Sequence, residues 1–240
     1  MALTPAQVQE LADRICAILI AHASHGLATS SLEGMGEITL RDSLIVAAAA
    51  AGAQTKQAWV LEREVLPTGW TDSAVDLVIY RSGNLGALKE VGGVELKWWR
   101  QTDKGNASNR RRDLVKDFIR AASLYPAVDD FIFVALLSTE VSWTSTTATR
   151  GADKAAMALL TATGSKIWKL RTLAASPAVK GAVRFLNEKV PIPNIFHSKL
   201  LSTLELHLAS GRSAFAKVWL VKKPQKTHYF TAAEIQEILQ

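Results

Sequence analysis

Apolar residues recur at every third or fourth position in two stretches near the N-terminus, the spacing that one buried face of a helix requires. The first stretch follows a Thr-Pro-Ala-Gln capping box at 4–7, which predicts an amphipathic helix to about residue 23. A Ser- and Gly-rich segment, 28–36, predicts a loop. The second stretch predicts a helix over 37–51, whose alanines would allow it to approach a sheet closely.

The next apolar stretches are shorter and rich in β-branched residues, which predicts three strands. They cover residues 59–65, 75–80 and 94–99. Turn-forming residues separate the second strand from the third, so these two should lie next to each other. Gly92 and Gly93 stand just before the third strand and predict a bulge or a close backbone approach there.

A helix is expected over 110–124, and the unbroken apolar run at 131–137 predicts a strand buried on both faces. Such strands are usually central and parallel to a neighbour, and a helical connection makes a right-handed crossover the expected topology. The resulting order is helix, three strands, helix, strand, from 37 to 138. The sequence therefore predicts an α/β fold with an αβββαβ core and a mixed central sheet.

The remaining third of the chain predicts an α+β extension, packed on or beside the core. Its expected parts are a Ser/Thr-rich loop at 141–149, helices at 152–163 and 177–190, a β-hairpin at 200–208 and 214–221, and a terminal helix behind a capping box at Thr231. The domain organisation is then an N-terminal helix and loop (1–36), the core (37–138) and the extension (139–240). This extension would cover the sheet, clamp a nucleic acid or mediate dimerisation.

Composition adds a bias toward acidic partners. The chain has 240 residues, a formal net charge of +6 and an isoelectric point near 9.5, which favours nucleic acid. Eight basic and three acidic residues fall between 97 and 120, so most of the surplus lies there. Cys16 is the only cysteine, which excludes an intrachain disulfide and a cysteine metal cage. We see no signal peptide and no apolar run near the ~20 residues of a membrane span, and expect a cytoplasmic protein.

Three ionisable residues interrupt the two adjacent apolar strands. Asp76 lies inside one strand, where an unpaired charge is costly, and Glu95 and Lys97 are two apart on the other, so they share a face. Two carboxylates suit Mg²⁺, which acidifies a bound water and neutralises charge on a phosphoryl transition state. A nearby lysine would orient that water and stabilise the same charge. The alternative is a solvated cross-strand ion pair.

Asp76 followed after 19 residues by Glu-x-Lys resembles the motif of the PD-(D/E)xK nucleases, which have the restriction-endonuclease-like fold. The resemblance covers about 37–138, where the expected element order agrees with it. It implies a Mg²⁺-dependent nuclease, with Mn²⁺ as a substitute, in which Asp76 and Glu95 bind metal and Lys97 is catalytic. One departure is Val75, where the family usually has proline. Glu37 resembles a carboxylate that reaches the metal site in this family, although a simple helix-dipole role is the alternative.

The basic residues after the motif would hold the phosphate backbone of the substrate. These expected nucleic-acid contacts are Lys104, Arg110, Arg111, Arg112 and Lys116. DNA is favoured as the substrate, a membrane partner is not expected, and a homodimer or a partner subunit stays open. The competing hypotheses are a nuclease-like module that binds nucleic acid or protein without cutting, and a subunit of a larger defence or repair assembly. Phosphate-loop, dinucleotide-binding and serine-hydrolase motifs are absent from the sequence.

Overall fold

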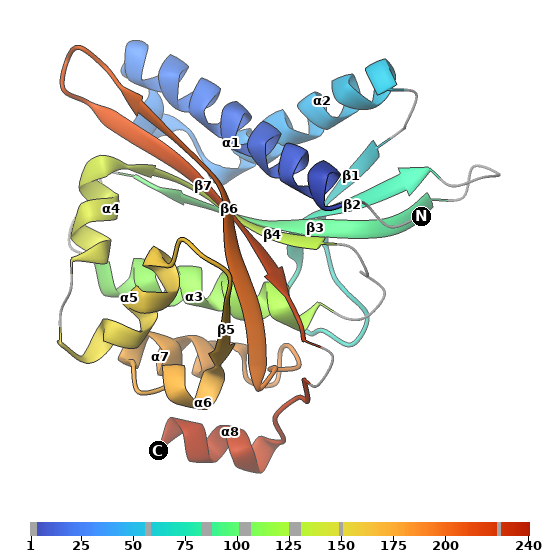
Figure 1. The fold of residues 1–240 in the computed structure, drawn as a ribbon, viewed down its shortest axis with the longest axis vertical. Coiled ribbons are helices and arrows are strands. Elements are labelled where there is room, and N and C mark those ends of the chain that lie inside the picture. The colour runs from blue at the N-terminus through green and yellow to red at the C-terminus, as the bar shows by residue number, and fades with distance from the viewer. Residues whose placement is uncertain are drawn as a thin grey trace.

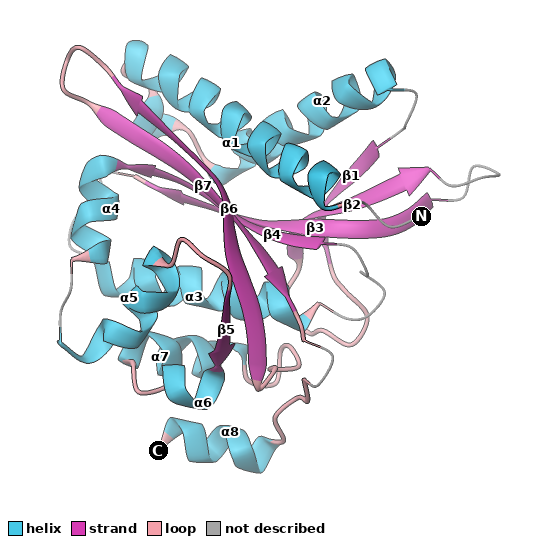
Figure 2. Ribbon diagram, in the orientation of Figure 1, coloured by secondary structure: helices cyan, strands magenta, loops and turns pink. Residues whose placement is uncertain are grey.

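A computed structural model describes residues 4–55, 59–82, 88–100, 107–124, 131–148, 151–224 and 227–240. It shows an α/β protein in which helices cover both faces of one mixed, strongly twisted sheet (Figures 1 and 2). The seven strands lie in the order β1-β2-β3-β4-β7-β6-β5. Their bounds are β1 Trp59–Val65, β2 Val75–Ser82, β3 Leu88–Trp99, β4 Phe131–Thr139, β5 Lys166–Lys169, β6 Ile195–His207 and β7 Ser213–Lys222.

Helices α1 and α2 lie on one face of the sheet and α3 to α7 on the other, as Figure 1 shows. The helices are α1 Pro5–Ala28, α2 Glu37–Thr55, α3 Ala107–Ser123, α4 Glu140–Thr147, α5 Lys154–Thr161, α6 Leu170–Leu173, α7 Pro177–Leu186 and α8 Ala232–Leu239. Each face has its own apolar core. Leu19, Leu40 and Leu96 belong to the core under α1 and α2, whereas Leu114, Phe118 and Trp219 belong to the core under α3.

The predicted order of helix, three strands, helix and strand is confirmed by α2, β1, β2, β3, α3 and β4. Strand β4 is buried along its whole length and pairs in parallel with β3, as an unbroken apolar run requires. The predicted close approach at Gly92 is also confirmed. Gly92 pairs with Phe131, and a Cβ atom at this glycine would lie 2.4 Å from a ring carbon of Phe131. No larger residue fits there without movement of β4.

Both capping boxes form. The side chain of Gln7 accepts a hydrogen bond from Thr4 N at 2.9 Å, and Gln7 N donates to Thr4 Oγ1 at 3.3 Å. Thr231 and Glu234 repeat the arrangement at the start of α8. Helix α1 runs to Ala28 and α2 to Thr55, so both continue past their predicted ends.

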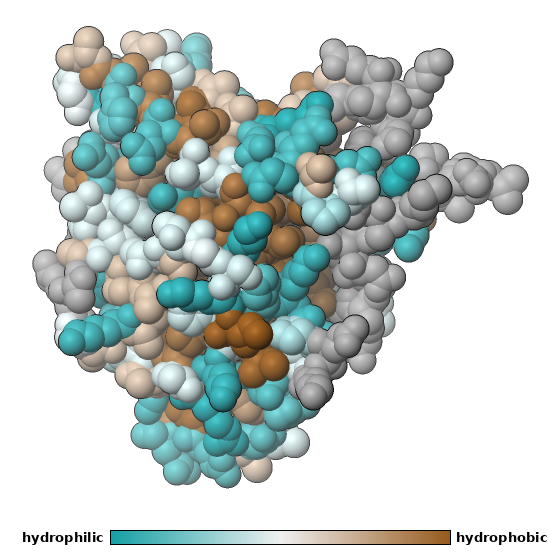
Figure 3. Space-filling view, in the orientation of Figure 1, coloured by the Kyte–Doolittle hydropathy of each residue, from teal (hydrophilic) through white to brown (hydrophobic). Residues whose placement is uncertain are grey.

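The C-terminal third extends the same sheet. The predicted hairpin is confirmed as β6 and β7, and β7 pairs antiparallel with β4, so the C-terminal strands continue the sheet of the core. Strand β5, which the sequence analysis did not predict, forms the edge next to β6 and exposes Ile167. Figure 3 shows an apolar area over this part of the molecule.

The expected loop at 141–149 is wrong, because its larger part forms α4. Thr139 caps this helix by accepting a hydrogen bond from Ser142 N at 3.3 Å. The polar residues that suggested a loop, Ser142 and Thr146, are buried, since they accept hydrogen bonds from Arg110 on α3. A Ser/Thr-rich segment is therefore helical here because another helix supplies donors for its hydroxyls.

Candidate active site

Asp76 and Glu95 lie on neighbouring antiparallel strands. The register of β2 and β3 pairs Leu77 with Val94, which makes Asp76 and Glu95 the next two residues in line. Glu95 and Lys97 both reach side chains of α3, whereas Val94 and Leu96, which alternate with them along β3, face the other core. The predicted shared face of Glu95 and Lys97 is thus confirmed.

Glu95 has no solvent exposure at all. Arg120 Nη2 on α3 lies 3.3 Å from its Oε1, but neither carboxylate oxygen has a hydrogen-bond partner among the described residues. Burial raises the pKa of Glu95 well above its usual range, and the negative charges of Asp76 and Asp117 raise it further against the effect of Arg120. The Glu95 carboxylate therefore has a charged neighbour in Arg120 but no hydrogen-bond donor among the described residues.

Lys97 lies between two carboxylates. Its Nζ is 3.7 Å from Asp117 Oδ2 and 3.4 Å from Glu37 Oε1. Asp117 is the main cause of a raised pKa of Lys97, despite the opposing effect of burial, and Glu37 adds to it. The ammonium group is therefore fully protonated at neutral pH and offers a fixed positive charge beside Glu95.

Glu37 belongs to this cluster through its position at the first turn of α2. Its Oε1 also accepts a hydrogen bond from Trp98 N at 3.1 Å, which ties the start of α2 to the end of β3. This contact shows that Glu37 does more than balance the dipole of its own helix. Its predicted role as a further metal ligand stays a prediction.

The carboxylate of Asp76 accepts a hydrogen bond from a backbone amide of the neighbouring strand β3 and also contacts an arginine of α2. Its Oδ2 accepts a hydrogen bond from Leu96 N at 2.8 Å, and its Oδ1 lies 3.5 Å from Nη1 of Arg41 on α2. Arg41 also binds Glu64 at 2.9 Å. The side chain of Asp76 retains 21% exposure and that of Glu37 retains 34%, so both carboxylates reach solvent whereas Glu95 does not.

Two residues of α3 complete the cluster, and the sequence analysis missed their role. Asp117 lies 3.6 Å from Arg120, in addition to its contact with Lys97, and burial raises its pKa to about 6. Arg120 also donates a hydrogen bond to the carbonyl of Ala74, at the entrance to β2. One signal was available: Asp117 falls in the helical repeat of Leu114, Phe118 and Ala121, where a charge is unexpected.

The predicted phosphate contacts of Arg110 and Arg111 are wrong, because both side chains are buried. Arg110 donates to Thr146 Oγ1 at 2.8 Å, and Arg111 pairs with Asp153 at 2.9 Å. These two arginines therefore pin α3 to the segment that follows β4. Arg112 and Lys116 keep some exposure, with 41% and 17% of their side chains accessible. Lys104 lies outside the described residues.

The two strand carboxylates suit a divalent cation in donor type. Mg²⁺ is usually held by one or two carboxylates and several waters, and the oxygens of Glu95 have no donor to satisfy them. Among the described residues, no group of three or more carboxylates, histidines or cysteines forms a ready cage. In donor type, Asp76 and Glu95 are the two residues that would hold such a cation.

No protein-family model, curated protein or solved structure matches this chain.

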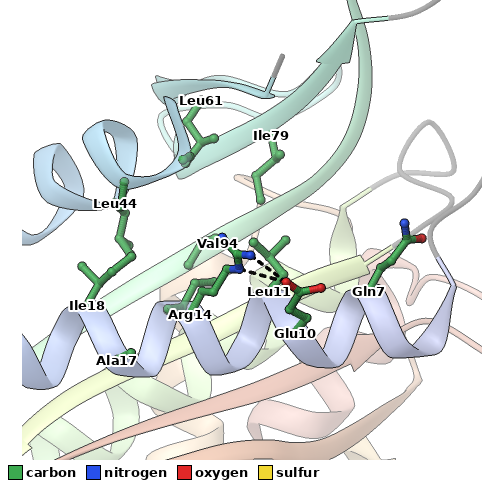
Figure 4. Close-up of a pocket in the computed structure, with 13 residues that line it drawn as sticks. Gln7, Glu10, Leu11, Arg14, Ala17, Ile18, Leu44, Leu61, Ile79 and Val94 are labelled. Carbon is green, nitrogen blue, oxygen red and sulfur yellow. Dashed lines mark hydrogen bonds and ion pairs between the residues drawn. The ribbon is translucent and has the colours of Figure 1, made fainter. Parts of the chain in front are cut away.

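A cavity lies on the other face of the sheet, apart from the carboxylate cluster. It has a volume of about 460 Å³ and lies between α1 and α2, on the face of the sheet opposite Glu95, and Figure 4 shows its mainly apolar lining. Ile18, Leu44 and Ile79 point into it, and the exposed pair Glu10 and Arg14 stands at its rim.

No helix in the described part of the chain is long and apolar enough to cross a membrane.

Proposed function

We propose that this protein is a metal-dependent phosphodiester hydrolase, a nuclease, that acts on nucleic acid and on DNA in preference to RNA. The observation that carries the proposal is the position of Asp76 and Glu95 in line on adjacent strands, with the Lys97 ammonium on the same face as Glu95. The buried oxygens of Glu95, which lack hydrogen-bond donors, support it. Most buried carboxylate oxygens in folded proteins have a hydrogen-bond partner, so this exception favours a functional role for Glu95.

Asp76 and Glu95 would hold Mg²⁺, or Mn²⁺ in its place. When bound, the metal makes a coordinated water more acidic and neutralises charge on the phosphate. Lys97 carries a permanent charge that stabilises the pentacoordinate phosphate and orients the attacking water. Asp117 and Glu37 hold the lysine from two sides, so its ammonium group has a fixed position before substrate arrives.

The proposal is tested by incubating the pure protein with labelled single-stranded and duplex DNA and RNA, in Mg²⁺, in Mn²⁺ and in chelator. We expect cleavage that requires metal. Lys97→Ala and Glu95→Gln should lower cleavage by at least about 10²–10³-fold, as comparable electrostatic groups do, because both act on the transition state. Glu10→Gln, a change of an exposed carboxylate on α1 outside the cluster, is the control and should cut like the wild type.

The second candidate is a nuclease-like module that binds nucleic acid or protein without cutting, alone or as a subunit of a defence or repair assembly. The pairing of Glu95 with Arg120 favours it, because a positive group already lies 3.3 Å from one of the proposed metal ligands. A wild-type protein that binds the panel but cuts nothing in either metal would reject the nuclease and retain this candidate. Equal cleavage by wild type and Glu95→Gln would reject the proposed site.

A further inference from the structure

A column of basic residues on α3 leads from the molecular surface to the carboxylate cluster. Arg112, Lys116 and Arg120 are spaced four residues apart, so they lie on one stripe of the helix. The exposed fraction of their side chains falls along the stripe from 41% to 17% and 12%. Arg120 is the end of the column and contacts Glu95.

Helix α7 lies alongside α3 and follows the same spacing (Figure 1). Gly181 packs against Arg112, and a Cβ atom at this glycine would lie 3.0 Å from Arg112 Cδ. Four residues later, the ring of Phe185 packs against Lys116, with 4.7 Å from Nζ to the ring centroid. The glycine thus leaves room for an arginine side chain to lie along the groove between the helices.

Phe185 is an exposed aromatic residue within a basic surface. Its relative exposure is 49%, and the ammonium group of Lys189 also lies over the ring, 4.2 Å from the centroid. Lys180 and Arg184 flank it on α7, on the stripe next to that of Gly181 and Phe185. Two ammonium groups, those of Lys116 and Lys189, therefore lie over the ring, and Arg112 lies against Gly181 one turn earlier on α7.

This surface is joined to the candidate site by the segment before β2. Thr71 N donates a hydrogen bond to Lys189 O at 2.8 Å, and Arg120 donates to the carbonyl of Ala74. The same segment then enters β2 at Val75, next to Asp76. Surface and site are thus parts of one connected structure.

We propose that Arg112, Lys116, Phe185 and Lys189, which we term the α3–α7 track, bind single-stranded nucleic acid and guide its backbone toward Asp76 and Glu95. The choice of nucleic acid rests on the proposed function. Basic residues around an exposed aromatic ring are the combination that single-strand binding uses, because the charges follow the phosphates and the ring stacks with a base. Both ammonium groups lie over the Phe185 ring, and Lys116 also lies 3.9 Å from Asp113, so a phosphate that binds them would compete with contacts inside the protein.

The test measures binding separately from cleavage. Fluorescence anisotropy with a labelled oligothymidylate, in chelator, gives the dissociation constant across a salt series. We expect the Lys116→Ala/Lys189→Ala double variant to bind at least roughly tenfold more weakly, with a salt slope reduced by about 0.7 for each lost contact. Phe185→Ala should weaken single-strand binding by roughly 5- to 150-fold, the effect of one lost stacked base, and Phe185→Tyr should restore it.

Two variants serve as matched controls and should bind as the wild type does. Lys166→Ala removes a lysine that also lies over an aromatic ring, that of Trp168, and Arg14→Ala removes a helical arginine paired with one carboxylate, as Arg112 is. A duplex of the same sequence and an RNA strand complete the panel. Phe185→Ala should affect the duplex less than the single strand, because paired bases are not free to stack on the ring.

Each outcome decides the proposal. Wild-type affinity and salt slope in both the double variant and Phe185→Ala would overturn it, even if the wild-type protein cuts DNA. Weakened binding in these variants would uphold the track even if nothing is cut, in which case only the nuclease fails. A Phe185→Ala variant that loses self-association in size-exclusion chromatography but keeps its nucleic-acid affinity would make this surface a protein interface and would also overturn it.

Discussion

The two faces of the sheet are covered in different ways. The core under α1 and α2 consists of apolar residues, apart from the buried Arg41 of α2 beside Asp76. Burial raises the pKa of the Cys16 thiol on this face to about 11, so the thiol is neutral and unreactive. Other charged pairs on this face, such as Glu10 and Arg14, lie at the surface. The face under α3 has an apolar core of similar kind, but Glu95 and Asp117 are buried within it.

This difference separates the parts of the molecule that stabilise the fold from the part that carries chemistry. Burying charges costs several kcal/mol per ion unless partners restore the lost solvation, and even paired charges are often no better than apolar residues. The raised pKa values of Glu95 and Asp117 show that their pairing is incomplete. We infer that the buried charges on the α3 face lower the stability of the protein below what the apolar packing alone would give. The following variants test this inference.

The largest effect is expected from Arg120→Ala. Removing this arginine leaves Glu95 buried without its positive partner, which should lower the free energy of unfolding by about 3–5 kcal/mol at pH 8. Because the pKa of Glu95 is raised in the folded state, the cost should shrink as the pH falls and Glu95 becomes neutral. Urea denaturation of the wild type and the variant at pH 8 and at pH 5 measures the loss of unfolding free energy and its dependence on pH. Adding Glu95→Gln should recover much of the loss, and an unchanged loss would show that the pair is not coupled.

A variant on the opposite face should lose slightly less unfolding free energy, and this loss should not depend on pH. Leu19 on α1 is fully buried, so Leu19→Ala should lower the free energy of unfolding by about 2–5 kcal/mol through lost burial and a cavity. The same denaturation series should give one value at both pH values, because no ionisable group loses its partner. A loss of unfolding free energy that differs strongly between the two pH values would contradict the proposed contrast between the two faces.

Asp117→Asn tests the charged face with little change in shape. The pKa of Asp117 rises to about 6 on folding, so the folded state binds a proton more tightly and the wild type loses stability as the pH rises from 4 to 7. The stability of the variant relative to wild type should therefore increase over this range by up to about 3 kcal/mol. Asp113→Asn, at a half-buried position on the same helix, is the control and should show no such trend.

The smallest effect is expected for the exposed pair on the apolar face. Arg14→Ala removes an ion pair of 2.7 Å whose side chains are 48% and 60% exposed. The free energy of unfolding should therefore change by less than about 1 kcal/mol. High salt should abolish whatever difference remains. A loss as large as that of Arg120→Ala would contradict the contrast between the two faces.

Local pattern was sufficient for the strands of the core and for part of the site. A short apolar stretch predicted β1, and the spacing of Glu95 and Lys97 placed both on one side of β3 because the pleat of a strand fixes that geometry. The contacts of Asp117 and Arg120 could not be predicted in the same way. They depend on how α3 is rotated when it packs on β3, which is a property of the tertiary structure.

The error at Arg110 and Arg111 has the same cause. Three consecutive arginines at the start of a helix are usually solvated, and no local signal shows that a later segment will cover two of them. Their partners are Thr146, on the helix that the sequence analysis took for a loop, and Asp153 after it. A wrong assignment of that segment therefore left these arginines without predicted partners.

The pairing of β4 with β7 has a consequence for biosynthesis. Phe133 of β4 pairs with Val94 on one side and with Leu220 on the other, so one of its neighbours is made long before it and the other long after. Until β7 leaves the ribosome, the most buried strand of the protein has an open, apolar edge that other chains can pair with. A fragment ending at 138 would keep that edge permanently. We therefore expect aggregation from such a fragment, although it contains every residue of the candidate active site.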